Sequence, residues 1–205
     1  MLFRSYDVTP TYKGSRKTLV DRYGWPIIYK EQRGKYWGKL NGPVSVRNTY
    51  VSNPDYKTKN LVTVTYSSTS GQTYKYYVHK ANQSALLTVL KTLDTKNLLP
   101  DANIQANPNP RDTTSEEAIK TGISSGILSG HAFGISIDVN SSEFDWGENG
   151  YQRYLTAVKS PSDSLYKKAQ VIKAFIDSKL FHWGGDFQPP TPKDAMHFTI
   201  RPYNI

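Results

Sequence analysis

The stretch Ser129-Gly130-His131-Ala132-Phe133-Gly134-Ile135-Ser136-Ile137-Asp138-Val139-Asn140 decides how the rest of the chain is interpreted. It places a histidine, His131, seven residues before an aspartate, Asp138. Near the C-terminus, Asp194-Ala195-Met196-His197-Phe198 adds a second histidine three residues after another aspartate. Two histidines and one aspartate form a three-ligand set for a catalytic zinc ion, with a fourth position left for water. The two stretches therefore predict a zinc site formed by the two histidines and one of the aspartates.

The second half of this stretch has the alternation of a β-strand with two different faces. Apolar side chains occupy one face and small or polar side chains the other: Ile135, Ile137 and Val139 against Gly134, Ser136 and Asp138. We therefore expect Asp138 to project from the face opposite the core. His131 lies just before the strand and reaches the same cleft if the chain bends near Gly134.

Segments upstream predict a hairpin followed by a helix. Residues 60–66 and 72–78 have strand composition and flank a turn-rich segment, which is typical of a hairpin. A helical pattern then opens at Asn82 and places apolar residues on one face as far as Leu93. Residues 107–128 predict a loop, Pro-rich at its start.

The C-terminal part predicts a second helix and a last strand. Residues 165–180 carry the best amphipathic stripe in the chain. Gly184 and Gly185 predict a tight turn. Residues 197–200 predict a short strand with His197 and Thr199 on one face.

Length and composition indicate a single globular domain with an N-terminal extension. The chain has 205 residues, which fits one domain, and we divide it into a basic aromatic extension over 1–44 and a main domain over 45–205. The aromatic and basic side chains of the extension suit glycan or nucleic acid, or a small aromatic core under extended charged side chains. Cysteine is absent, so a metal would need histidine and carboxylate ligands.

The net charge of +9 indicates either a basic surface with no particular partner or attraction to a polyanion, such as nucleic acid or the anionic bacterial cell wall. No apolar run has the roughly 20 residues of a membrane span, and the first residues lack the apolar core of a signal peptide. We therefore expect neither a membrane span nor an export signal.

Three motifs together resemble one family of zinc peptidases. They are Ser129-x-His131-Ala132-Phe133-Gly134-x-x-x-Asp138-x-Asn140, Trp183-Gly184-Gly185-Asp186-Phe187 and Asp194-x-Met196-His197-Phe198. In this order they resemble the D-alanyl-D-alanine carboxypeptidase / L-alanyl-D-glutamate endopeptidase family, and most of all its phage-type peptidoglycan endopeptidases. The resemblance covers about residues 45–205. It implies an α+β fold with a small central antiparallel sheet and flanking helices, the LAS-type peptidase fold.

The resemblance also implies roles for individual residues. His131, Asp138 and His197 match the family's zinc ligands, and Asp194 matches its general base, which is Glu in many relatives. Arg111 matches an upstream arginine that contacts substrate or the developing oxyanion. The chain departs from the pattern after His197, where relatives often have Phe-Glu and this chain has Phe198-Thr199.

Other polar residues near the motifs keep more than one interpretation. His182 is a second-shell or substrate-facing residue, a possible oxyanion donor, or a turn residue. Asp186 either holds a ligand histidine through its ring N–H or caps a turn. Ser129 and Asn140 are expected to support the ligand motif through backbone hydrogen bonds. His79 has no acidic residue in sequence reach and is not expected to bind metal.

The expected function is zinc-dependent hydrolysis of peptide bonds in bacterial peptidoglycan, at L-Ala–D-Glu or a D-amino-acid cross-link. The partners would be the stem peptides and the anionic wall, and the source a phage or prophage. The protein would be part of the virion, or accumulate in the host cytoplasm until its release to the wall. The alternatives are a D-Ala-D-Ala carboxypeptidase, an inactive phage tail module, and a nucleic-acid-binding protein suggested by charge alone.

Overall fold

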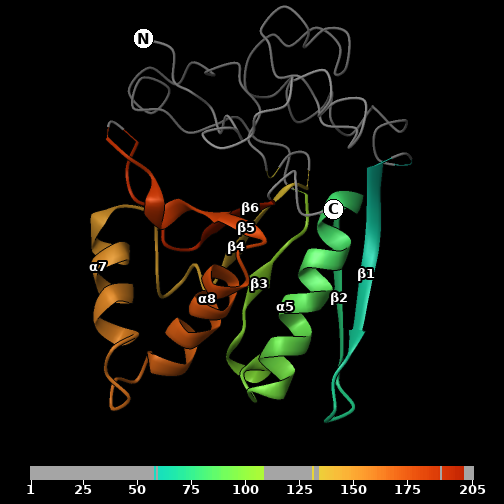
Figure 1. The fold of residues 1–205 in the computed structure, drawn as a ribbon, viewed down its shortest axis with the longest axis horizontal. Helices are drawn as coiled ribbons and strands as arrows, with labels where there is room; N and C mark the ends of the chain where they lie inside the picture. Colours follow the sequence, from blue (N-terminus) through green and yellow to red (C-terminus); the bar gives the residue numbers. More distant parts are fainter. Residues whose placement is uncertain (1–57, 59, 109–130, 132–133, 190, 201–205) are drawn as a thin grey trace, which may run out of the picture.

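The computed structural model describes residues 58, 60–108, 131, 134–189 and 191–200. Within these ranges the chain forms an α+β fold with two small antiparallel sheets and three α-helices (Figure 1). The predicted extension over 1–44 lies outside the described residues. So does most of the predicted loop, from 109 to 128, with Arg111. In the described part, no helix is long and apolar enough to span a membrane.

The predicted hairpin is present and is shifted by one residue. Strand β1 (Leu61–Ser67) pairs antiparallel with β2 (Thr73–His79), from Leu61 opposite His79 to Ser67 opposite Thr73. Gly71 has a φ of +84° in the turn, a conformation that glycine adopts without strain. The turn residues that separate the two strands therefore set the register of the hairpin.

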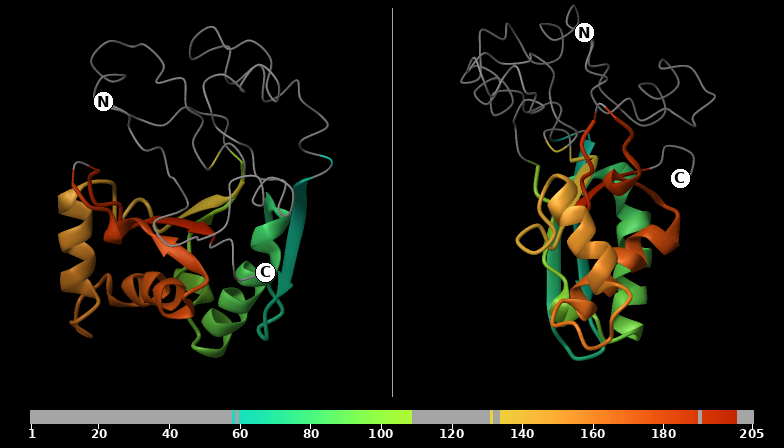
Figure 2. Two further views of the ribbon diagram at one scale, coloured as in Figure 1. Left: turned by 45° about the horizontal axis from the view of Figure 1, so that its top comes forward. Right: turned by 90° about the vertical axis from the view of Figure 1, so that its left-hand side faces the viewer.

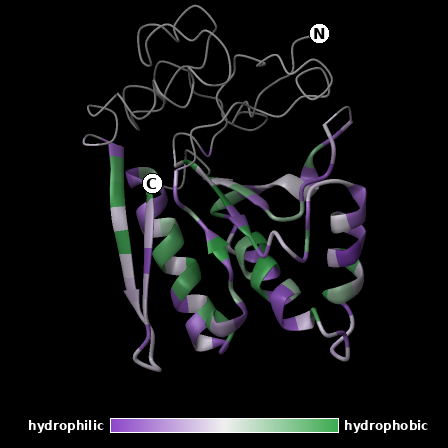
Figure 3. Ribbon diagram, turned by 180° about the vertical axis from the view of Figure 1, so that it is seen from behind, coloured by the Kyte–Doolittle hydropathy of each residue, from purple (hydrophilic) through white to green (hydrophobic). Residues whose placement is uncertain are grey.

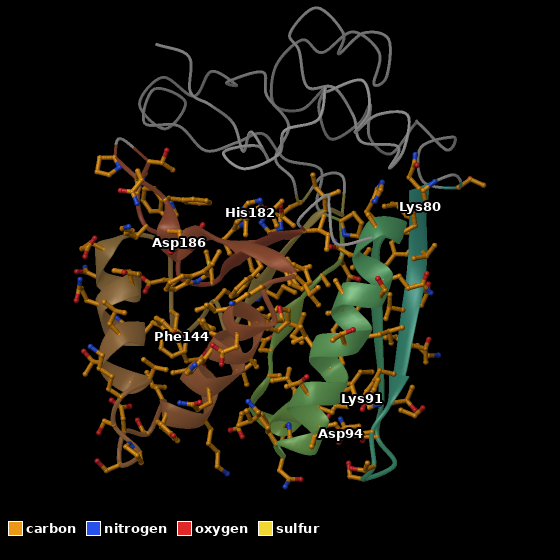
Figure 4. All side chains as sticks on the ribbon, in the orientation of Figure 1. Lys80, Lys91, Asp94, Phe144, His182 and Asp186 are labelled. Atoms are coloured by element: carbon orange, nitrogen blue, oxygen red, sulfur yellow. The ribbon has the colours of Figure 1, made fainter. Side chains whose placement is uncertain are left out.

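The predicted first helix is also present and packs beside this hairpin. A short 3-10 helix, η2 (Lys80–Asn82), leads into α5 (Gln83–Thr95), whose apolar stripe is buried. Near the C-terminal end of α5, Asp94 accepts hydrogen bonds from the Tyr66 hydroxyl and the Thr69 backbone N–H, both at 2.9 Å. Figure 4 shows Lys80 and Asp94 near opposite ends of this unit. The hairpin and α5 are therefore joined through polar contacts as well as through their core.

The second sheet has four strands in the order β3-β4-β6-β5. Its members are β3 (Ile104–Gln105), β4 (Ser136–Val139), β5 (Phe181–Trp183) and β6 (His197–Ile200), and all neighbours are antiparallel. A 3-10 helix, η3 (Leu99–Asp101), precedes β3. The strand predicted around Asp138 is confirmed over Ser136–Val139 as β4, and the strand predicted at 197–200 is confirmed as β6. They lie side by side although they are distant in the sequence.

One face of this sheet is apolar and packs against a helix. Helix α8 (Tyr166–Ser178), which confirms the predicted helix over 165–180, places Phe175 against Phe181 and Phe198, with ring centroids 5.5 and 5.0 Å apart. Figure 2 shows the helix beside the strands, and Figure 3 shows apolar residues gathered on the strands and on parts of α5 and α8. The core therefore lies between the sheet and the helices α5 and α8.

The opposite face of the sheet is polar but is not exposed. Strand pairing sets Ser136 opposite Thr199 and Asp138 opposite His197. All four residues are buried, with at most 9% of their surface exposed. The prediction that apolar and polar side chains occupy opposite faces is therefore correct, but both faces of β4 and β6 are covered.

The structure contains one helix, α7 (Glu148–Ala157), that the sequence analysis did not predict. Helix α7 buries Gly150, Tyr154 and Ala157 at helical spacing, so its buried stripe is short and contains a glycine and a tyrosine in place of aliphatic side chains. Gly147, with φ of +101°, precedes it. Tyr154 holds it to the rest of the domain through ring contacts with Phe144 and Trp183. A short stripe at helical spacing, reinforced by these ring contacts, therefore fixes this helix.

His79 makes the stability of this fold depend on pH. Its side chain is fully buried at the end of β2, and its Nδ1 accepts the Ala81 backbone N–H at 3.1 Å. Burial, with a smaller contribution from the positive charge of Lys80, lowers the pKa of His79 from 6.5 to about 4. The folded protein therefore binds this proton less readily than the unfolded chain does.

We predict that the free energy of unfolding falls by roughly 3 kcal/mol from this residue as the pH drops from 6.5 to 4. The contribution is intact above the unfolded pKa and is lost between the two values. Denaturant unfolding at several pH values, comparing wild type with His79→Gln, measures it, because all other titrating groups are shared. Parallel pH profiles for the two proteins would contradict the assignment.

Candidate active site

Three of the sequence-predicted residues meet at one point on the polar face of the four-stranded sheet. Asp138 on β4 and His197 on β6 are direct cross-strand neighbours, and His131 precedes β4. His131 Nε2 lies 3.0 Å from His197 Nδ1. Each of these nitrogens lies 3.3 Å from Asp138 Oδ1. The result is a nearly equilateral triangle of donor atoms.

This triangle has the dimensions of a zinc site. Metal–ligand distances of about 2.0–2.1 Å in a tetrahedral site place the donor atoms about 3.3–3.4 Å from one another. Two imidazole nitrogens and one carboxylate oxygen are also the donor types that zinc accepts. The three side chains are the only group in the described residues that combines this composition with such proximity. They could therefore hold a zinc ion without rearrangement.

The electrostatics of the cluster favour an ionised Asp138. Burial opposes ionisation, but hydrogen bonds and positive charge from His131 and His197 outweigh it and hold the pKa of Asp138 well below its usual value. A carboxylate that stays ionised at neutral pH is ready to serve as a ligand, since a metal requires deprotonated donors.

The position of His131 depends on a bend at Gly134, as the sequence indicated. Gly134 has φ of +68°, and its N–H donates to the His131 carbonyl at 3.2 Å. Its own carbonyl accepts two hydrogen bonds, from the His79 backbone N–H at 2.9 Å and from Asn82 Nδ2 at 2.7 Å. A Cβ at Gly134 would lie 2.8 Å from the His79 nitrogen. We call this arrangement of Gly134, His79 and Asn82 the Gly134 clamp.

The other ligand histidine is positioned by a close approach of two backbone segments. Asp194 is buried, its N–H donates to the Gly184 carbonyl at 3.0 Å, and its carbonyl accepts the His197 N–H at 3.2 Å. Gly184 opens the 3-10 helix η5 (Gly184–Asp186), and a Cβ there would meet the Asp194 carbonyl oxygen at 2.3 Å. Gly184 is thus required for close packing around Asp194, rather than only for a turn.

The remaining predicted residues fall at different distances from the cluster. His182 is half-buried on β5 opposite Thr199, so it lies on the same face of the sheet as the ligands. Asp186 is exposed on η5 (Figure 4), which favours the turn interpretation over contact with a ligand.

Arg111 and Ser129 lie outside the described residues. Asn140 is buried, and its amide bonds to the backbone of Asn103 and Lys168, so its side-chain hydrogen bonds connect β4 to other segments rather than to the ligand motif.

Two residues near the site have roles that sequence reasoning missed. Asn82 was interpreted as the residue that opens helix α5, but its side chain makes no cap and instead donates to Gly134. Trp146 forms an isolated antiparallel bridge with Asp194, and half of its surface is exposed. The bridge therefore places an exposed aromatic residue directly opposite Asp194. Its position could not be found without knowledge of the bridge.

Comparison with known proteins agrees with this geometry. Residues 122–200 match the model of a family described as D-alanyl-D-alanine carboxypeptidase. The matched segment contains the three donor residues as well as Asp194. No curated protein and no solved structure gives a significant match. The match and the His/Asp/His cluster together support a zinc-dependent metallopeptidase, and they leave its substrate open.

We predict that Gly184→Ala displaces Asp194 and His197, because the added methyl group meets backbone atoms that cannot rotate away. The expected results are a loss of about 1–3 kcal/mol of stability and a zinc affinity lowered at least about tenfold, as expected when the environment of a ligand is disturbed. Thermal unfolding and competition with a chromophoric chelator measure the two effects.

Gly71→Ala is the matched control for this change. It also adds a methyl group at a glycine, with φ of +84° and nothing within 4 Å, in a turn of the hairpin. It should lower stability without changing zinc affinity. Equal zinc affinity in Gly184→Ala and wild type would refute the positional role of Gly184.

Proposed function

We propose that this protein is a zinc-dependent peptidase that cuts the peptide part of bacterial peptidoglycan. The observation that carries the proposal is the triangle of donor atoms from His131, Asp138 and His197, with Asp194 beside His197. The match to a family of enzymes that is described by its action on D-alanyl-D-alanine supports this substrate class. The net charge of +9 suits an enzyme that works on an anionic cell wall.

The proposed chemistry assigns separate roles to the metal and the protein. His131, Asp138 and His197 would hold a zinc ion, with the carboxylate offsetting part of its charge. When bound there, zinc would polarise the scissile carbonyl group and lower the pKa of water at the open position. Asp194 is the general base that takes a proton from the attacking water and then donates it to the leaving amine. Its backbone contacts with Gly184 and His197 fix its position relative to the ligands.

Stabilisation of the oxyanion is assigned to a positively charged or hydrogen-bonding side chain. Arg111 is the first candidate, on the basis of the resemblance to the family. His182 is the second, because it lies on the ligand-bearing face of the sheet next to Thr199. The two assignments differ in what they predict for substitution of each residue, so they can be separated by kinetics.

The proposed scissile bond is L-Ala–D-Glu or a cross-link that contains a D-amino acid. We further propose that the protein is a phage or prophage product, carried in the virion or released at lysis. A D-Ala-D-Ala carboxypeptidase is the second candidate, and the description of the matched family favours it. An inactive tail module is disfavoured, because the ligand set is intact.

The decisive experiment is mass spectrometry of fragments released from purified peptidoglycan. We expect soluble muropeptides with a new free amino terminus within the stem or cross-link, and no release after treatment with a zinc chelator. Restoration by added zinc distinguishes metal removal from denaturation. Release of free D-alanine alone would support the carboxypeptidase. Absence of any product from folded, zinc-loaded protein would refute the proposal.

We predict that Asp194→Asn lowers kcat by about 10²–10⁴-fold, as expected for loss of a general base, while zinc content stays at the wild-type level. Asp177→Asn is the matched control, because Asp177 is an exposed carboxylate on α8 whose partner is Lys173. It should leave both kcat and zinc content unchanged, since an exposed ion pair contributes little. Wild-type turnover in Asp194→Asn would exclude Asp194 as the base.

A further inference from the structure

Two buried hydroxyl groups extend from the far side of the His197 ring. His197 Nε2, the nitrogen that does not face the donor triangle, lies 2.9 Å from Thr199 Oγ1. Thr199 Oγ1 lies 2.7 Å from Ser136 Oγ on the neighbouring strand. The exposed fractions of His197, Thr199 and Ser136 are 2%, 4% and 2%. Water therefore cannot readily replace any of these contacts.

We propose that Thr199 and Ser136 are positioning residues that hold His197 in the tautomer and orientation needed to bind metal. This inference rests on the zinc site of the proposed function. It assigns to Thr199 the task of accepting the ring proton, and to Ser136 the task of orienting the Thr199 hydroxyl.

The direction of the hydrogen bond from His197 follows from which ring nitrogen would bind a metal. His197 Nδ1 faces His131 Nε2 and Asp138 Oδ1, so Nδ1 is the atom that would bind a metal. A neutral imidazole carries one proton, and a metal-binding nitrogen must be without it. The proton is then on Nε2, where Thr199 Oγ1 accepts it. The Thr199 hydroxyl keeps a second lone pair and its own proton, and it shares a hydrogen bond with Ser136 Oγ, which restricts its rotation.

Strand pairing makes the arrangement rigid. Ser136 and Thr199 are cross-strand neighbours in the same register that sets Asp138 opposite His197. The hydroxyl pair and the ligand pair are therefore two successive rungs on one face of the sheet. A ring held at Nε2 by a fixed acceptor loses little freedom when Nδ1 binds metal. Partners of this kind beyond the ligands typically contribute 10–100-fold in metal affinity.

A purely structural explanation is also available, because hydroxyl pairs across strands stabilise sheets. The two explanations differ in their effect on metal binding. If the hydroxyls only support strand pairing, their removal lowers stability and leaves the zinc affinity of the folded protein unchanged. If they position His197, zinc affinity falls in the folded protein.

The test uses the full chain and compares Thr199→Val, which removes the hydroxyl at similar size, with Thr199→Ser, which keeps it. Zinc affinity is measured by chelator competition, and the tautomer of His197 by NMR of protein labelled with ¹⁵N-histidine. We expect zinc affinity to fall about 10–100-fold in Thr199→Val and to stay within a few-fold of wild type in Thr199→Ser. Ser136→Ala should give a smaller loss in the same direction.

The outcomes separate this inference from the proposed function. Failure of wild type to bind zinc refutes the zinc site itself. Tight binding by wild type with equal affinity in Thr199→Val overturns only the positioning role, and so does an equal loss in Thr199→Val and Thr199→Ser. If Thr199→Val does not fold, Ser136→Ala decides, because unchanged zinc affinity in that variant overturns the role.

Discussion

The register between β4 and β6 is the constraint on which the rest of the structure depends. It sets Asp138 opposite His197 and, on the next rung of that face, Ser136 opposite Thr199. Because side chains alternate along a strand, a slip of one residue would turn the polar side chains of either strand into the core. The same slip would separate the donor atoms. Folding of the core and assembly of the site are therefore one event.

The sheet separates two kinds of interior. On one face, Phe198 and Phe181 pack against Phe175 of α8, and burial of aromatic surface stabilises the fold. On the other face, polar side chains are buried and depend on one another for hydrogen bonds, which is costly when a partner is lost. A bound metal would offset part of that cost, since metal affinity adds to the free energy of folding. The apolar face of the sheet thus forms the core, and the polar face carries the candidate site.

The sequence predicted the elements that depend on the order of apolar and polar residues within one segment. Alternation at 133–140 indicated a strand with Asp138 and Ser136 on one face, and the apolar stripe at 165–180 indicated a helix. Motif resemblance brought Asp194 and His197 into the same site, and the close packing of Gly184 with Asp194 is consistent with it. The pairing of segments that are distant in the sequence could not be predicted, because the residue pattern within one segment does not identify its partner. The role of Asn82 depends on where the Gly134 carbonyl lies. The stripe of α7 is short and includes a glycine, and ring contacts made by Tyr154 reinforce it.

The Gly134 clamp defines how much chain forms one working unit. The segment that matches the peptidase family begins at residue 122. The two groups that donate hydrogen bonds to the Gly134 carbonyl, the backbone N–H of His79 and the side-chain amide of Asn82, lie before that segment. Without these donors the carbonyl before the ligand strand would have to find other partners, and the turn that carries His131 would lose its attachment. The hairpin and α5 therefore hold the turn that carries the metal-ligand candidate His131. A fragment that keeps the candidate site intact therefore has to begin before β1 rather than at residue 122.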